Sequence, residues 1–209
     1  MSFGLVKHNN NSLSSITSAG NLTQGKMTLI KEQTASSSSS ISFVDGSGGV
    51  VLDNTYPIYL FKFINIHCSN DDENFQFNLS ADTGSNYNVT KTTTLFTADH
   101  NEGDSGHGLN YNGSRDLAQG TGNVNLAHRL GSDNDQSASG TLHFFDISNT
   151  TFVKHFFGIF NHSLAGDTSI NNYVAGYGNT TSAIDAVKFV MSSGNIDSGT
   201  IKLYGIKGS

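Results

Sequence analysis

The stretch from residue 183 to residue 207 reads AIDAVKFVM-SSGNIDSG-TIKLYGIK, which is two alternating runs around a loop rich in Ser, Gly, Asn and Asp. The apolar residues that share one side of each run are Val187, Phe189 and Met191, then Ile201 and Leu203. Side chains alternate between the two faces of a β-strand, so each run predicts a strand with one apolar face. A two-strand unit is not stable alone in water, so the rest of the chain must supply the sheets that cover it.

Similar patterns occur upstream. Residues 56–66 are bulky on both sides and predict a central strand, and residues 74–81 alternate cleanly. Residues 139–146 and 151–160 flank a short polar turn, which predicts a β-hairpin. The expected core residues are Phe61, Phe63, Phe75, Phe77, Leu79, Leu142, Phe189, Ile201 and Leu203. About nine to eleven short strands without a convincing helix predict an all-β fold, an antiparallel β-sandwich or jelly roll.

The first 26 residues differ from the rest because they are polar and sustain no period. We expect residues 1–26 to be an extended N-terminal arm and residues 27–209 to be the β-sandwich domain. The arm has too few apolar residues to fold alone, yet it has more apolar residues than is typical of a solvated tail. We therefore expect it to make intermolecular contacts, in a homo-oligomer or in a particle lattice.

The composition excludes several classes of protein. Charged residues are only 13% of the chain and aromatic residues are 10%, which fits a β-protein with uncharged polar outer faces rather than a disordered chain. The net charge is -6 without a basic cluster, so we expect no nucleic-acid partner. The single Cys68 excludes a disulfide scaffold, and no apolar run predicts a membrane span. We also expect no signal peptide and synthesis in the host cytoplasm.

No nucleophile–base pair, phosphate loop or dinucleotide fingerprint occurs, so the sequence predicts no catalytic and no cofactor-binding residue. The best ligand-rich cluster lies in a loop-like stretch, residues 99–114. Its metal candidates are Asp99, His100, Glu102, Asp104 and His107. Carboxylates could hold calcium, and imidazoles could hold a transition metal. The spacing matches no metal motif, so we expect a solvated loop without metal.

Two further groups of residues invite a chemical interpretation. His143 and His155 lie in the two strands of the expected hairpin and could form a pH-sensitive pair, although two half-buried strand residues are the favoured interpretation. His67 and Cys68 are adjacent in a strand and so point to opposite faces, which is a poor arrangement for a base and a nucleophile. We expect Cys68 to be buried and unreactive.

Three segments carry a resemblance to a known family: NLTQGKMTLIK at 21–31, SADTGSNYNVTKTTT at 80–94 and SSGNIDSGTIKLYGI at 192–206. They resemble small virion proteins of marine tailed bacteriophages, including cyanophages. The resemblance covers most of the chain from about residue 12. It implies a structural component of β-sandwich type, located in the virion, and it supplies no catalytic residue.

The expected function is therefore that of a non-enzymatic virion structural protein on the particle exterior, as capsid decoration or as a tail or fibre component. Its expected partners are further copies of the chain, with a trimer as the expected oligomer, and other virion structural proteins. The first alternative is a receptor- or carbohydrate-binding adhesin that binds a host-surface glycan, for which Tyr111 and Tyr177 are the candidate aromatic platforms. The second alternative is a glycan-degrading enzyme.

Overall fold

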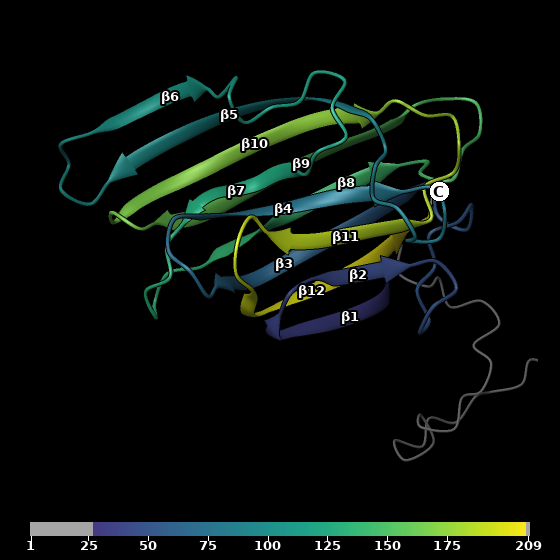
Figure 1. The fold of residues 1–209 in the computed structure, drawn as a ribbon, viewed down its shortest axis with the longest axis horizontal. Helices are drawn as coiled ribbons and strands as arrows, with labels where there is room; N and C mark the ends of the chain where they lie inside the picture. The colour runs from purple at the N-terminus through teal and green to yellow at the C-terminus, as the bar shows by residue number, and fades with distance from the viewer. Residues whose placement is uncertain (1–26, 208–209) are drawn as a thin grey trace, which may run out of the picture.

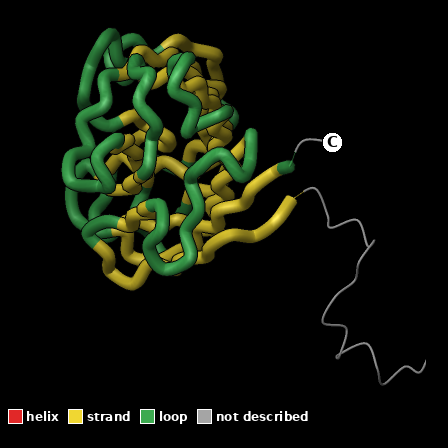
Figure 2. The backbone as a smooth tube through the Cα atoms, turned by 90° about the vertical axis from the view of Figure 1, so that its right-hand side faces the viewer, coloured by secondary structure: helices red, strands yellow, loops and turns green. Residues whose placement is uncertain are grey.

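The computed structural model describes residues 27–207, and these form strands and loops without a helix (Figures 1 and 2). In chain order the strands are β1 (Met27–Ser38), β2 (Ile41–Val44), β3 (Ile58–Cys68), β4 (Glu73–Ser80), β5 (Lys91–Asn101), β6 (His107–Tyr111), β7 (Val124–Leu130), β8 (Ala138–Phe145), β9 (Lys154–Leu164), β10 (Thr168–Gly178), β11 (Ala186–Met191) and β12 (Ile196–Ile206). The expected all-β class is confirmed. The N-terminal arm, residues 1–26, lies outside the described residues.

Eight of the strands follow the order of a jelly roll. One sheet contains β1-β12-β3-β8 and the other contains β2-β11-β4-β7, and every pairing is antiparallel. β1 passes into β2 across two residues, which joins the sheets at one edge. At the opposite edge Leu130 of β7 pairs with Leu164 of β9. These two connections nearly close the sandwich, as expected for an antiparallel protein that leaves few free edges.

Four additional strands widen one sheet. β9 pairs with β8 and β10, β10 pairs with β5, and β5 pairs with β6, so the larger sheet runs β1-β12-β3-β8-β9-β10-β5-β6. The smaller sheet ends at β7. The strands β10, β5 and β6 therefore extend past the edge of the smaller sheet, at the top of Figure 1, and we call them the overhang.

The two alternating runs within residues 183–207 form β11 and β12, but these strands do not pair with each other. β11 lies in the smaller sheet between β4 and β2, and β12 lies in the larger sheet between β1 and β3. Both apolar sides face the core from opposite sheets, because Phe189, Ile201 and Leu203 are fully buried. The alternation therefore correctly predicted which side of each strand is buried.

The core is aromatic. All nine residues expected in it are buried. The ring of Phe189, from the smaller sheet, lies 5.2 Å from Phe61 and 5.0 Å from Phe63 of the larger sheet, between ring centroids. It also lies 6.0 Å from the ring of Phe75 in β4. Aromatic pairs at these separations add to the free energy gained by burial, so this cluster holds the two sheets together.

One expectation about local structure is wrong. The stretch 99–114 is not one loop, because β5 continues to Asn101 and β6 begins at His107. Leu109 and Tyr111 alternate with Gly108 and Asn110, and the short strand that they form covers the free edge of β5. The hairpin of β8 and β9 is confirmed.

Candidate functional site

The outward side chains of the larger sheet form the first candidate surface, which we call the outer face. Nine large hydrophobic side chains are exposed within residues 27–207, and the strand registers place eight of them on this face. They are Met27, Leu29, Ile64, Phe96, Leu109, Tyr111, Phe157 and Ile159, which are 40–73% exposed. The ninth, Phe152, lies in the loop before β9. Scattered exposed apolar residues need no explanation, but a set gathered on one face indicates an interaction surface.

The strand register aligns part of this set into a row. Ile159 of β9 pairs with Tyr173 of β10, Tyr173 with Phe96 of β5, and Phe96 with Tyr111 of β6. The rings of Phe96 and Tyr173 stack with centroids 4.7 Å apart and planes inclined by 5°. Beside this row the small side chain of Ala175 helps to leave a shallow hollow of about 180 Å³. The outer face thus offers both a flat aromatic surface and a depression that an apolar side chain can fill.

On the outer face, five neighbouring strands carry histidines but no other titratable acid or base that is charged at neutral pH. The outward positions of β8, β9, β10, β5 and β6 contain no Asp, Glu, Lys or Arg. The charges on the face lie on the other three strands, where Lys202 pairs with Glu32 at 2.9 Å and Lys62 lies over the ring of Tyr204. Loss of charged residues distinguishes the centre of a protein–protein interface from ordinary surface. The apolar row therefore lies in the region that most resembles an interface centre.

The second candidate surface lies on the inner side of the overhang, and we call it the polar groove. It is a hollow of about 470 Å³ where the ends of β5, β6 and β10 meet the end of β7. Its polar lining includes Thr97, Asp99, Asn110, Asn112, His128 and Arg129. Asn110 donates to Asp99 Oδ1 at 3.3 Å, and Asn112 donates to Thr97 Oγ1 at 2.9 Å. The hydrogen bonds between lining residues hold the amide groups in defined positions.

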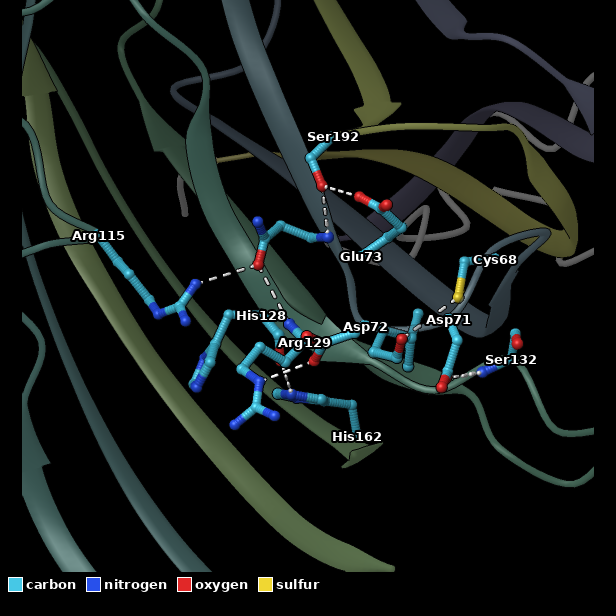
Figure 3. A network of polar contacts seen from close by, with 12 residues as sticks. Cys68, Asp71, Asp72, Glu73, Arg115, His128, Arg129, Ser132, His162 and Ser192 are labelled. Carbon is cyan, nitrogen blue, oxygen red and sulfur yellow. Dashed lines mark hydrogen bonds and ion pairs between the residues drawn. The ribbon is translucent and has the colours of Figure 1, made fainter. Parts of the chain in front are cut away.

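Both arginines of the chain lie beside this groove. Arg115 donates through Nη1 to Asn74 Oδ1 at 3.2 Å, and the same oxygen accepts the backbone N–H of Arg129 at 3.1 Å. His128 lies between the two arginine side chains in Figure 3. Arg129 donates through Nε to Asp72 Oδ1 at 2.7 Å. This ion pair fixes one edge of the guanidinium, and the acidic side chains of Asp71 and Glu73 belong to the same polar network in Figure 3.

Two histidines are buried beneath the groove. The rings of His128 and His162 lie 5.5 Å apart, and His162 Nε2 donates to the carbonyl of His128 at 2.7 Å. The pKa of each residue is lowered to about 4, mainly by burial, and the nearby Arg115 contributes to the lowering at His128. Each Nδ1 has no hydrogen-bond partner among the described residues, and neither has the buried Asn172 Oδ1. Both imidazoles are therefore uncharged near neutral pH, and each has one buried ring nitrogen without a hydrogen-bond partner among the described residues.

Four of the five metal candidates are divided between two hollows, and Asp104 lines neither of them. Asp99 and His107 line the polar groove, and His100 and Glu102 line a neighbouring hollow of about 530 Å³. His100 Nε2 lies 3.0 Å from Asp104 Oδ1. No group of three or more His, Cys, Asp or Glu side chains within residues 27–207 is placed to hold one metal ion.

We predict that folding does not depend on a metal at this loop. The charged groups of residues 99–107 are solvated or hydrogen-bonded where they stand, so removing metal should not change them. Thermal unfolding with and without a chelator measures this, and the two melting temperatures should be equal. A melting temperature that falls with chelator and returns with calcium or zinc would contradict the prediction.

The remaining candidate residues from the sequence analysis lie on strands and pack against neighbouring side chains. Tyr111 and Tyr177 are on strands of the outer face rather than in loops. His143 stacks on Phe157 at 4.7 Å, and His155 lies beside Tyr177, so the two histidines do not face each other as a pair. Cys68 is fully buried, and burial raises the pKa of its thiol to about 11. A thiol that stays protonated is a poor nucleophile.

Comparison with known proteins gives no match to a family model, a curated protein or a solved structure. The resemblance to phage virion proteins therefore stays a prediction. Within the described part of the chain, no helix is long and apolar enough to cross a lipid bilayer.

Sequence reasoning missed both surfaces. The overhang was hidden because residues 107–111 were interpreted as loop, although Leu109 and Tyr111 alternate with polar residues. The ion pair between Arg129 and Asp72 joins residues that are far apart in the chain, so no local pattern predicts it. One signal in the sequence could have pointed to the polar groove. The chain contains only two arginines, and both lie beside this groove.

Proposed function

We propose that this chain is a non-enzymatic structural component on the exterior of a tailed-phage particle, and that it works as a homo-oligomer assembled through its outer face. Three copies is the expected number. Other structural proteins of the particle are the expected further partners. The observation that supports the proposal is the gathering of eight exposed hydrophobic side chains on an outer face that is half free of charge.

The size of this surface suits an interface. Five of the eight side chains lie on the strands without Asp, Glu, Lys or Arg, and with an area on the order of 200 Å² each and roughly half of it exposed they offer about 500 Å² of apolar surface. Somewhat more than half of the surface that a partner contributes to an interface is apolar. One partner contributes about 800 Å² to a stable protein–protein interface of standard size. A second copy of the chain is the favoured occupant because the same surface is then covered on every copy in the particle.

The alternative role, an adhesin module of a tail fibre, draws support from a different observation. The polar groove lies on the opposite side of the overhang from the apolar row. A copy of the chain that covers the outer face would therefore leave the groove open. The two roles are compatible in one protein.

The mass of the protein in solution tests the oligomer. We expect light scattering to give a multiple of the 22.3 kDa chain mass for the wild-type protein. Ile159→Lys places a charge at one end of the apolar row, on the strand β9 near the middle of the outer face, where an interface would bury it without a partner. This variant should shift the mass to that of the monomer.

Phe152→Lys is the matched control, because Phe152 is the one exposed large hydrophobic residue of the described chain that lies off the outer face. This variant should keep the oligomeric mass. A wild-type protein that stays at 22.3 kDa at every concentration would contradict the proposal, and so would an Ile159→Lys variant with the wild-type oligomeric mass.

A further inference from the structure

The polar groove has the lining of a site for a polyhydroxylated ligand. Its amides, carboxylate, hydroxyl and imidazole provide donors and acceptors side by side, and Leu164 and Ile170 are its only large apolar residues. Sugars offer neighbouring hydroxyls that pair with such groups. The volume of about 470 Å³ is in the range of small-molecule sites and holds one or two sugar units.

Arg129 adds a charge preference to this lining. Its side chain is half exposed, and its Nε edge is held by Asp72. Its two Nη groups make no hydrogen bond within residues 27–207, so they remain free to bind a ligand. A guanidinium binds a planar carboxylate through two parallel hydrogen bonds, which a lysine cannot reproduce.

An unpartnered buried group beneath the groove supports the presence of an ordered water there. His128 lines the groove, is 7% exposed, and has an Nδ1 without a hydrogen-bond partner in the described chain. Native proteins pair nearly all buried polar atoms, with protein, water or ligand. Because this Nδ1 is itself covered by protein, a buried water beneath the groove is its fitting partner, and a ligand in the groove does not contact it.

We propose that the polar groove binds a carboxylate-bearing sugar unit of an acidic polysaccharide, with the carboxylate on Arg129 and the hydroxyls on Asn110 and Asn112. A polyphosphate chain such as nucleic acid does not fit, because it needs several cations along its path and the groove offers one guanidinium. The inference does not depend on the oligomer, since the groove and the apolar row lie on opposite sides of the overhang.

Titration of the full-length protein with polygalacturonate, and separately with neutral dextran, tests the proposal. We expect binding to polygalacturonate and none to dextran. Arg129→Gln should weaken the binding by about tenfold or more, the effect of losing a charge-assisted hydrogen-bonded pair. Asn110→Ala, at an exposed position that does not threaten folding, should weaken it as well.

Lys202→Gln is the matched control. It removes one positive charge from a comparable ion pair, 2.9 Å from Glu32, at a distance from the groove. This variant and Ile159→Lys should bind polygalacturonate as the wild type does, and melting temperatures should show that every variant is folded. Absence of binding, equal binding to dextran, or an equal loss in Arg129→Gln and Lys202→Gln would each overturn the proposal.

Discussion

Replacing Phe189 with alanine is expected to lower the free energy of unfolding by about 3–5 kcal/mol, because the cavity left behind lies where the surrounding rings cannot collapse. The side chain is fully buried, and its ring lies within 6.2 Å of four other phenylalanine rings, centroid to centroid, that come from both sheets. A loss of this size is a large fraction of the stability of a typical domain. Urea unfolding followed by circular dichroism measures it.

Phe152→Ala is the control for this experiment. The side chain of Phe152 is 66% exposed, so its truncation should change the free energy of unfolding by less than about 0.5 kcal/mol. If Phe189→Ala unfolds at the same urea concentration as the wild type, the ring cluster does not hold the two sheets together and the arrangement of the core is wrong.

Acid is expected to destabilise the protein well before its carboxylates are protonated. His128 and His162 have pKa values near 4 in the fold and 6.5 as the reference value, so the unfolded chain takes up protons first. Their contribution to stability is complete above pH 6.5 and is lost progressively as the pH falls toward 4. At about 1.4 kcal/mol per pH unit for each group, the loss is on the order of 3 kcal/mol per histidine.

The pH window separates this effect from that of the carboxylates. Hydrogen bonds lower the pKa of Asp53 and Asp82 below 3.8, so their contributions are lost only in stronger acid. Free energies of unfolding measured between neutral pH and pH 4 should fall, and His128→Gln should make that fall shallower. His100→Gln, at an exposed position, should leave it unchanged. A constant free energy over this range would contradict the description of the histidine pair.

Much of the fold could be predicted from local patterns. Alternation identified the buried sides of β4, β11 and β12, because burial of one face is what fixes a side-chain period of two. It did not reveal which strands pair, since β11 and β12 have similar patterns and lie in different sheets. The order of strands is set by contacts that are distant in the sequence, and no local pattern records them.

The candidate surfaces were harder to predict for the same reason. The outer face is apolar only because residues from β9, β10, β5 and β6 become neighbours, and each strand alone shows an ordinary alternation. Buried charge was also hidden. Lys91 reads as a surface residue, yet it is fully buried and donates through Nζ to Asn78 Oδ1 and to the carbonyl of Val89, both at 2.6 Å. Burial lowers the pKa of its ammonium group to about 8.

The most direct test of the central proposal is a cryo-EM map of the phage particle that we propose carries this protein. Fitting the sandwich into the map gives the orientation of each copy without any change to the sequence. We predict that several copies lie together on the particle exterior, and that the row of Ile159, Tyr173, Phe96 and Tyr111 is covered by a neighbouring copy. A map in which this row faces solvent on every copy, or in which the protein is absent from the particle, would contradict it.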